Sequence, residues 1–305
     1  MVSEPSVPRR AGTVALLGRP NAGKSTLLNR IIGQKLAIVS DKPQTTRTRV
    51  VGVKNYPDGQ LVFVDTPGLH RPTHRMNARM VDLARDTIHE VDVVGLLVDA
   101  SVKTGQGDRY VLEMLRPSGR PTVLILNKVD RLEKAALLPM LEWYREAYPF
   151  VEFVPLSARD GTNVDVLERL FLRYVPEGDP LYPEDHLTDQ TERFLTAELV
   201  REQVLRMTRD ELPFSTTVVV EQFNEAGDGG ILKIYCSILV ERDSQKRIVV
   251  GHGGSLIKAI GTAARLELER HFQSRVFLDL HVKVKSEWRN DEHLLDEIQK
   301  QNRSS

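Results

Sequence analysis

The chain has 305 residues, 41% of them hydrophobic and 28% charged, and this composition excludes an intrinsically disordered protein. Its 42 basic and 42 acidic residues cancel, so the molecule lacks the overall positive charge of a general nucleic-acid binder and any basic surface must be local. The single cysteine, Cys236, excludes an intramolecular disulfide framework. No stretch approaches the ~18 consecutive apolar residues of a membrane-spanning helix.

The length favours two domains. Residues 1–10 contain two prolines and two arginines but no apolar core, which predicts a flexible N-terminal tail rather than a signal peptide. These features predict a cytoplasmic protein.

Short runs rich in Val and Leu alternate with helical patterns through residues 11–176. The expected strands are Thr13–Leu17, Val50–Tyr56, Leu61–Asp65, Val93–Val98, Thr122–Leu126 and Phe153–Leu156, and the expected helices include Ser25–Ile32, Arg75–Glu90 and Leu137–Ala147. Such runs are typical of parallel strands buried on both faces. The alternation therefore predicts a doubly wound α/β domain, with Val50–Tyr56 added as one arm of a hairpin that turns at Pro57–Gly59.

Residues 177–188 are rich in proline and acid and predict a linker. The pattern changes over residues 189–305, which predict an α+β domain. The expected order is a helix at Asp189–Arg209 capped by its aspartate, strands at Thr216–Phe223 and Ile231–Val240, helices at Gln245–Val250 and Ser255–Phe272, a strand at Val276–Lys285 and a last helix at Glu292–Gln301. A turn at Ala226–Gly230 would join the first two strands, and Cys236 would face the core.

A GxxxxGK[ST] motif follows the first expected strand and opens the first expected helix. Its members, with the residue after it, are the predicted phosphate-binding residues Gly18, Arg19, Pro20, Asn21, Ala22, Gly23, Lys24, Ser25 and Thr26. Small residues let backbone N–H groups wrap phosphates, Lys24 supplies a positive charge to the β- and γ-phosphates, and Ser25 offers a hydroxyl to Mg²⁺.

Two further segments complete the expected phosphate and magnesium site. Asp65, Thr66, Pro67 and Gly68 end a strand, where the Asp65 carboxylate can hold Mg²⁺ and the Gly68 N–H can contact a γ-phosphate. In the preceding loop, Thr45 or Thr46 can bring a hydroxyl to Mg²⁺, and we favour Thr46.

The segment Asn127-Lys128-Val129-Asp130 ends another expected strand. The Asp130 carboxylate can accept both donors of the guanine edge, which adenine does not present, so it predicts selection of GTP over ATP. Asn127 would brace the loop, Lys128 would lie along the purine face, and Ser157 and Ala158 would close over the base by backbone contact.

The sequence lacks one expected catalytic group. Ras-like GTPases orient the attacking water with a Gln after the Asp-x-x-Gly motif, whereas Leu69 follows Gly68 here, then His70. Either hydrolysis is slow, or another group helps. Asn21 is one candidate, because its amide oxygen can hold a monovalent cation such as K⁺ beside the phosphates, and we interpret His70 as a switch-loop residue.

Gly251, His252, Gly253 and Gly254 lie between two expected helices. Such a turn allows a nucleic-acid backbone to approach N–H donors at a helix start. From Arg242 to Arg289 there are ten Lys or Arg against five Asp or Glu, so a local positive excess is hidden in the neutral total. Without Lys or Arg between the glycines, phosphate contacts would come from backbone N–H groups, Lys246, Arg247 or Lys258.

Taken together, these motifs resemble the Era family of bacterial GTPases, within the TrmE-Era-EngA-like P-loop superfamily. The resemblance rests on Gly18–Ser25 with its Pro20-Asn21 pair, Thr45–Arg47, Asp65–His70, Asn127–Asp130, the KH-like GxxG segment Arg247–Gly261 and the closing segment Val282–Trp288, and it covers about Thr13 to Leu295. It implies a P-loop GTPase domain followed by a type II KH domain, the arrangement that the second half's helix and strand order fits.

The same resemblance implies binding near the 3′ end of small-subunit (16S) rRNA, a role in 30S ribosomal subunit assembly, and peripheral association with the cytoplasmic face of the inner membrane. We expect a monomer. Two alternatives stay open. One is a kinase that uses the P-loop to phosphorylate a small substrate, against which Asn127–Asp130 argues. The other is a module whose nucleotide gates docking to a membrane or protein partner without RNA binding.

Overall fold

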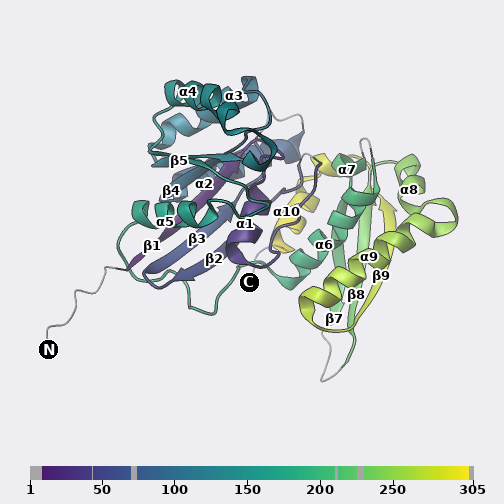
Figure 1. The fold of residues 1–305 in the computed structure, drawn as a ribbon. Coiled ribbons are helices and arrows are strands. Elements are labelled where there is room, and N and C mark those ends of the chain that lie inside the picture. Colours follow the sequence, from purple (N-terminus) through teal and green to yellow (C-terminus); the bar gives the residue numbers. More distant parts are fainter. Residues whose placement is uncertain (1–8, 43, 70–73, 210–211, 225–229, 302–305) are drawn as a thin grey trace, which may run out of the picture. The chain divides into compact units, whose positions relative to one another are not determined.

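The computed structural model describes residues 9–42, 44–69, 74–209, 212–224 and 230–301, and its elements are drawn in Figure 1. The chain divides into two compact units. Unit 1 consists of residues 1–37, 44–73 and 77–189, and unit 2 of residues 38–43, 74–76 and 190–305. None of the described helices combines the length and the apolarity needed to cross a bilayer.

Unit 1 is built on a six-stranded sheet whose strand order is β2-β3-β1-β4-β5-β6. The strands are β1 (Arg10–Gly18), β2 (Val50–Tyr56), β3 (Gly59–Asp65), β4 (Val93–Asp99), β5 (Thr122–Asn127) and β6 (Glu152–Pro155). β1 runs parallel to β3 and β4, while β2 is antiparallel to β3. This confirms the predicted doubly wound sheet and its added hairpin, and it brings the carboxyl ends of β1, β3 and β5 to one edge.

Two cores cover the two faces of this sheet. Residues of β1 alternate between them: Val14 and Leu16 pack with α1 (Lys24–Ile32) and α5 (Val164–Tyr174). Ala15 and Leu17 pack with α2 (Arg75–Glu90), α3 (Gln106–Leu115) and α4 (Leu138–Ala147). A strand buried on both faces needs apolar residues at every position, which is why β1 reads as a continuous apolar run.

The segment expected to be a linker makes several hydrogen bonds to the β2–β3 hairpin. The Gln60 amide donates to the Tyr182 carbonyl at 2.8 Å, and its oxygen accepts from the Leu181 and Tyr182 N–H groups at 2.8 and 2.9 Å. The Thr188 hydroxyl donates to the Val51 carbonyl at 2.6 Å. Residues 181–188 therefore follow the hairpin as part of unit 1.

Unit 2 contains a three-stranded sheet in the order β7-β8-β9. Its elements are α6 (Glu192–Met207), α7 (Leu212–Ser215), β7 (Thr217–Asn224), β8 (Leu232–Val240), α8 (Asp243–Val250), α9 (Ser255–Phe272), β9 (Val276–Val284) and α10 (Glu292–Gln301). β7 and β8 are antiparallel and β8 and β9 are parallel. The mixed sheet confirms the predicted KH arrangement. Cys236 is buried in its core, and burial raises the pKa of the thiol to about 12.

Three details of unit 2 differ from the predictions. The aspartate cap was wrong: α6 begins after Thr191, whose hydroxyl accepts from the Phe194 N–H at 3.1 Å, while Asp189 accepts from the Tyr182 hydroxyl at 2.8 Å. α7 had no sequence signal, because it spans only four residues. Val284 is 37% exposed, so the buried face of β9 ends at Val282. Most of the predicted turn 226–230 lies outside the described residues.

Candidate functional site

The phosphate-binding loop joins β1 to α1 through residues with positive φ. φ is 147° at Gly18, 63° at Asn21 and 100° at Gly23. A Cβ at Gly18 would lie 2.3 Å from the Leu97 carbonyl oxygen, and one at Gly23 would lie 2.2 Å from the Asn127 amide nitrogen. Glycine is required at both positions because no other residue combines these angles with such close approach.

Lys24, the predicted phosphate-contacting lysine, is buried at the start of α1. Its ammonium donates to the Gly18 and Arg19 carbonyl oxygens, each at 3.3 Å. Burial lowers the pKa of Lys24, and the nearby Asp65 carboxylate opposes that shift. The ammonium is therefore held inside the loop, where it can meet the phosphates that the loop encloses.

The three predicted magnesium ligands lie together. The Ser25 hydroxyl donates to Asp65 Oδ2 at 2.7 Å, the Thr46 hydroxyl to the same oxygen at 3.3 Å, and the two hydroxyl oxygens are 2.9 Å apart. Asp65 is completely buried, and its Oδ1 has no hydrogen-bond partner within the described part of the chain. Burial raises the pKa of this carboxyl group. A buried carboxylate oxygen beside two hydroxyl groups is a donor set that suits Mg²⁺.

The loop after β3 packs against the phosphate-binding loop. A Cβ at Gly68 would lie 2.8 Å from Pro20 Cα, and the Leu69 N–H donates to the Gly18 carbonyl at 3.1 Å. Thr66 is fixed by donating its hydroxyl to the Leu16 carbonyl at 2.9 Å. The Leu69 side chain is buried in the core on the α2–α4 side of the sheet, and His70 lies outside the described residues.

Asn127 and Lys128 connect the predicted guanine-recognition loops to the predicted phosphate-binding loop. The Asn127 amide donates to the Ala22 carbonyl at 2.8 Å and accepts from the Ala158 N–H at 2.9 Å. The Lys128 ammonium donates to the Asn21 carbonyl at 2.7 Å and to Asp99 at 2.6 Å. Asp99 was not among the predicted residues, although the pairing of β4 with β5 places it opposite Asn127.

Asp130 is oriented by two neighbours. Its Oδ1 accepts from the Ser157 hydroxyl at 2.7 Å, and its Oδ2 lies 3.0 Å from Arg159 Nη2. The predicted base-closing residues Ser157 and Ala158 are buried, which fixes the loop that carries them. The pairing of Arg159 with Asp130 was not predicted, because it depends on how two loops meet.

The second candidate site is the glycine turn between α8 and α9. φ is 75° at Gly251, 57° at Gly253 and 80° at Gly254. A Cβ at Gly251 would lie 2.8 Å from the Leu256 nitrogen, whereas Gly253 and Gly254 face open space. The turn thus exposes backbone directly before the N-terminus of the 18-residue helix α9, whose first turn has no acidic residue.

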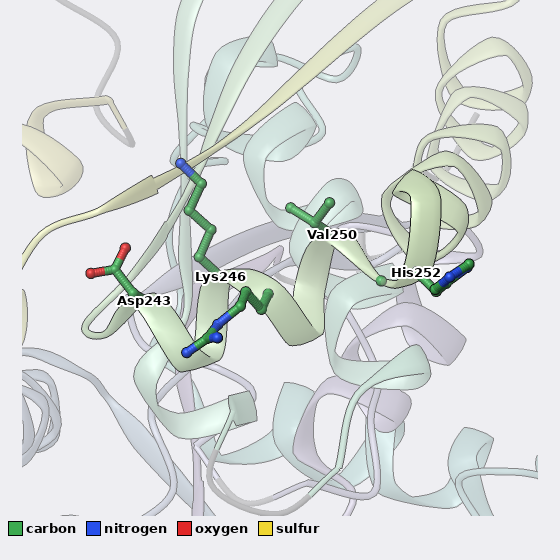
Figure 2. A pocket seen from close by; sticks show the side chains of 6 residues that line it. Asp243, Lys246, Val250 and His252 are labelled. Carbon is green, nitrogen blue, oxygen red and sulfur yellow. The ribbon is translucent and has the colours of Figure 1, made fainter.

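An open pocket of about 700 Å³ lies beside this turn (Figure 2). It is lined by Asp243, Lys246, Arg247, Val250, Gly251 and His252. Lys246, Arg247 and Lys258 form no ion pair among the described residues. By contrast, Arg265, Arg270, Lys283, Lys285 and Arg289 are each paired with a carboxylate. Three of the basic residues of this segment therefore carry positive charge near the turn without a carboxylate partner in the part of the chain that the structure describes.

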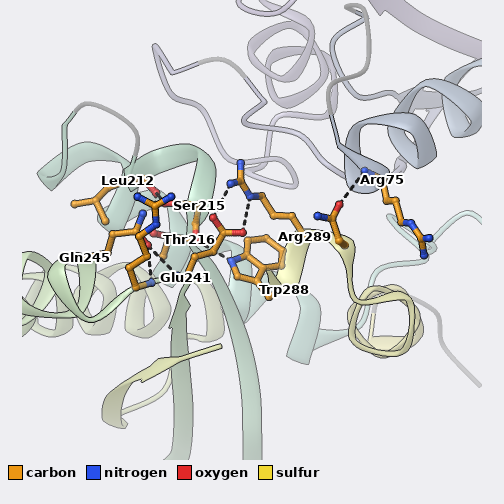
Figure 3. Close-up of polar contacts among 10 residues, drawn as sticks. Arg75, Leu212, Ser215, Thr216, Glu241, Gln245, Trp288 and Arg289 are labelled. Atoms are coloured by element: carbon orange, nitrogen blue, oxygen red, sulfur yellow. Dashed lines mark hydrogen bonds and ion pairs between the residues drawn. The ribbon is translucent and has the colours of Figure 1, made fainter. Parts of the chain in front are cut away.

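The start of α8 is held by the side chain of its own Gln245 and, through Glu241, by Arg289 (Figure 3). The Gln245 amide oxygen accepts from the Glu241 and Arg242 N–H groups at 2.9 and 3.1 Å, and Arg289 forms an ion pair with Glu241 at 2.6 Å. The buried Trp288 donates its indole N–H to the Ser215 carbonyl at 2.8 Å. These contacts position the helix that leads into the glycine turn.

Two family profiles match the chain. One, described as "50S ribosome-binding GTPase", covers residues 13–128, and the other, described as "KH domain", covers residues 211–289. The chain is 48% identical to GTPase Era of Geobacter metallireducens over 291 residues, with 95% of this chain and 98% of the relative covered. It is 45% identical to GTPase Era of Heliobacterium modesticaldum, with 92% and 93% covered.

Solved structures agree over both units. A crystal structure of Era in complex with MgGDPNP and nucleotides 1506–1542 of 16S ribosomal RNA superimposes with a TM-score of 0.91 at 38% identity, covering 94% of this chain and 98% of that one. A variant of Era from Aquifex aeolicus bound to GDP and AlF₄⁻ gives a TM-score of 0.89 with the same identity and coverage.

Proposed function

Because the chain belongs to the Era family of GTPases, we propose that it is a GTP-driven switch that binds the 3′ region of small-subunit rRNA and assists assembly of the 30S subunit. The observation that carries this proposal is that Ser25, Thr46 and Asp65 are hydrogen-bonded to one another beside the phosphate-binding loop. The same chain also contains a basic GxxG turn. We assign the GTPase role to residues 11–176 and RNA binding to residues 189–305, with 177–188 between them.

In the nucleotide site, backbone N–H groups of the Gly18–Thr26 loop, in which Pro20 has none, donate to the phosphates, and Lys24 neutralises the charge that develops on them. Mg²⁺, held by Ser25, Thr46 and Asp65, would supply further charge neutralisation at the β- and γ-phosphates. The Gly68 N–H contacts the γ-phosphate, so that its loop and that of Thr46 respond to hydrolysis. Water attacks in line with the bond that breaks.

Asp130 accepts the guanine N1–H and N2–H₂ groups. Ser157 keeps the carboxylate in place, Lys128 lies along the purine face, and the Ala158 backbone closes over the base. Adenine has an amino group at position 6 and an unprotonated N1, so it does not offer this pair of donors to the carboxylate. ATP is therefore rejected.

In the absence of a water-orienting Gln, we propose that Asn21 holds K⁺ beside the phosphates. The test compares GTP turnover in K⁺ and Na⁺ for the wild type and Asn21→Ala. The wild type should turn over faster in K⁺, and the variant should lose that preference. Equal rates of the wild type in both salts would contradict the cation role.

The glycine turn, with Lys246, Arg247, His252 and Lys258 around it, is proposed to hold a single-stranded RNA backbone. Gly253→Asp tests this, with Gly253→Asn as its matched control. Both residues tolerate a positive φ and both enter open space, so only the added negative charge differs. The Asp variant should bind the 3′-terminal rRNA segment at least tenfold more weakly than the Asn variant, with GTP binding unchanged in both.

The coupling of the two activities is tested by steady-state GTP hydrolysis with and without that RNA segment or small ribosomal subunits. Stimulation by RNA supports the assembly switch. If RNA neither binds nor stimulates, unit 2 loses its proposed role and the alternative, nucleotide-gated docking to a membrane or protein partner, gains.

From the family resemblance we also propose a monomer in the cytoplasm with peripheral association at the inner membrane. Light scattering measures the mass directly. Sedimentation with vesicles of 30% anionic lipid, compared with neutral vesicles, measures association, and binding to neither kind would count against the membrane proposal.

A further inference from the structure

The side chain of Arg19 leaves the phosphate-binding loop and reaches the first turn of α3. Its Nη1 lies 3.0 Å from Asp108 Oδ2, and the two residues are separated by 89 positions in the sequence. Gly107 makes room for this path, because a Cβ there would lie 2.8 Å from Arg19 Nε. The guanidinium thus runs over the backbone of α3 to meet the carboxylate.

Asp108 is held by two further donors. The Gly105 N–H donates to Oδ2 at 2.8 Å, and the Tyr144 hydroxyl of α4 donates to Oδ1 at 3.0 Å. The carboxylate is only 6% exposed and Tyr144 only 1%. Burial and the negative charge of Asp108 raise the pKa of Tyr144, so the phenol stays protonated and remains a donor. Three donors at fixed positions leave Asp108 little freedom.

Arg19 is also the residue whose backbone closes the phosphate loop. Its carbonyl oxygen accepts from the Ala22 N–H and from the Lys24 ammonium, each at 3.3 Å. The position of Arg19 therefore sets the direction of the N–H groups that follow it. A displacement of about 1 Å in such a loop can cost ~100-fold in rate.

We propose that Asp108 is a positioning residue of the nucleotide site, which acts through Arg19 to hold the phosphate-binding loop in its binding conformation. The proposal rests on the proposed function of that loop. A purely structural role for Asp108, as the acidic residue that receives the Gly105 N–H at the start of α3, makes a different prediction, because it does not involve Arg19.

The experiment measures the Kd for GDP and GTP, kcat and thermal unfolding of the full chain for Arg19→Gln, Asp108→Asn and the double variant. Glu168→Gln is the matched control: Glu168 is also a buried carboxylate, paired with Lys54 at 2.9 Å, but it belongs to α5 and contacts β2 instead of the phosphate loop. Arg19→Lys tests rescue, since it keeps one donor and the charge.

We expect Arg19→Gln and Asp108→Asn each to raise the Kd for GDP about tenfold, and the double variant to bind no worse than either, as for residues acting as one unit. Arg19→Lys should recover part of the affinity. Glu168→Gln should lower the unfolding temperature and leave the Kd unchanged.

The proposal is overturned if Arg19→Gln binds GDP within twofold of the wild type, or if the two single effects add fully in the double variant. Arg19→Gln leaves the contacts of Asp108 with Gly105 and Tyr144 in place. The comparison of Arg19→Gln with the wild type therefore remains decisive even if Asp108→Asn does not fold. Failure of the wild type itself to bind GDP would instead refute the proposed function of the loop.

Discussion

Arg289 holds Glu241 through two nitrogen atoms. Nε and Nη2 lie 3.0 and 2.6 Å from the two carboxylate oxygens, and the side chains are 19% and 14% exposed. Glu241 stands between the end of β8 and the start of α8, while Arg289 follows the buried Trp288. The pair therefore joins the segment after β9 to the helix that leads into the glycine turn. A shielded bidentate pair of this kind is stronger than an exposed ion pair.

Replacement of Arg289 by Ala should therefore destabilise unit 2 by about 2 kcal/mol, because it leaves a partly buried carboxylate without its partner. Urea unfolding can be followed by Trp288 fluorescence in a Trp143→Phe background, since the chain has only these two tryptophans. Arg270→Ala is the control: its pair with Glu267 is more exposed, and its loss should cost less than ~0.5 kcal/mol. Equal losses in the two variants would show that the Arg289 pair is an ordinary surface contact.

Replacement of Asp130 by Asn should change the base preference of the nucleotide site. The amide replaces one acceptor oxygen with a donor, so guanosine nucleotides should bind about 100-fold more weakly, and xanthosine nucleotides, which carry a carbonyl at position 2, should bind better than GDP. Competition with a fluorescent GDP analogue measures both affinities.

Ser157→Ala provides an internal comparison for that experiment. It removes the 2.7 Å hydrogen bond that orients Asp130 without changing the carboxylate. GDP affinity should fall by roughly fivefold, the scale of one hydrogen bond, with guanine still preferred over xanthine. A change of base preference in this variant would show that Asp130 alone does not select the base.

The parts of the fold that sequence predicted well are those where local pattern and tertiary environment agree. The apolar run of β1 must be buried on both faces, and the residues beyond it form a phosphate loop whose glycines have conformations closed to other residues. The prediction of the α6 cap was wrong because Asp and Thr are both favoured N-cap residues, so the sequence offers Asp189 and Thr191 alike. Asp189 accepts a hydrogen bond from the Tyr182 hydroxyl instead, and Thr191 caps the helix. The sequence pattern does not reveal that tertiary contact.

The same distinction holds in the site. Ser25, Thr46 and Asp65 could be identified because each belongs to a motif at a strand end or loop. Asp108 and Arg159 carry no motif of their own. Asp108 is recognisable only once α3 is placed beside Arg19, 89 residues earlier in the chain. Periodicity and motif spacing do not encode that contact, since it arises from helix packing.

The ionisation of Asp65 should make the free energy of unfolding depend on pH. Burial raises the pKa of this carboxyl group in the folded protein above its unfolded value, so in the intervening pH range the folded state binds more protons. Its contribution to stability therefore falls as pH rises through that range. Asn has no such titration, so the unfolding free energy of Asp65→Asn relative to the wild type, without nucleotide or Mg²⁺, should increase as the pH rises above the ordinary pKa of an aspartic acid.

With Mg²⁺ and GDP present, the ionised form of Asp65 should stabilise the folded protein instead. Once ionised, Asp65 of the wild type can bind Mg²⁺, so Mg²⁺ with GDP should raise the unfolding temperature of the wild type more than that of Asp65→Asn. Thermal unfolding over a pH series, with and without Mg²⁺ and GDP, checks both statements. A constant difference between the two proteins at all pH values would mean that Asp65 does not titrate in this range.

The basic residues at the glycine turn should determine how RNA binding depends on salt. Lys246 and Arg247 line the pocket and form no ion pair among the described residues, whereas Arg270, at the other end of α9, is paired with Glu267. For single-stranded nucleic acid, each phosphate contact contributes ~0.7 to the slope of log K against log salt concentration. Lys246→Gln and Arg247→Gln should each reduce the slope by about that amount. Arg270→Gln should leave the slope unchanged, and an equal change in all three variants would show that the RNA contact is not confined to the turn but reaches the far end of α9.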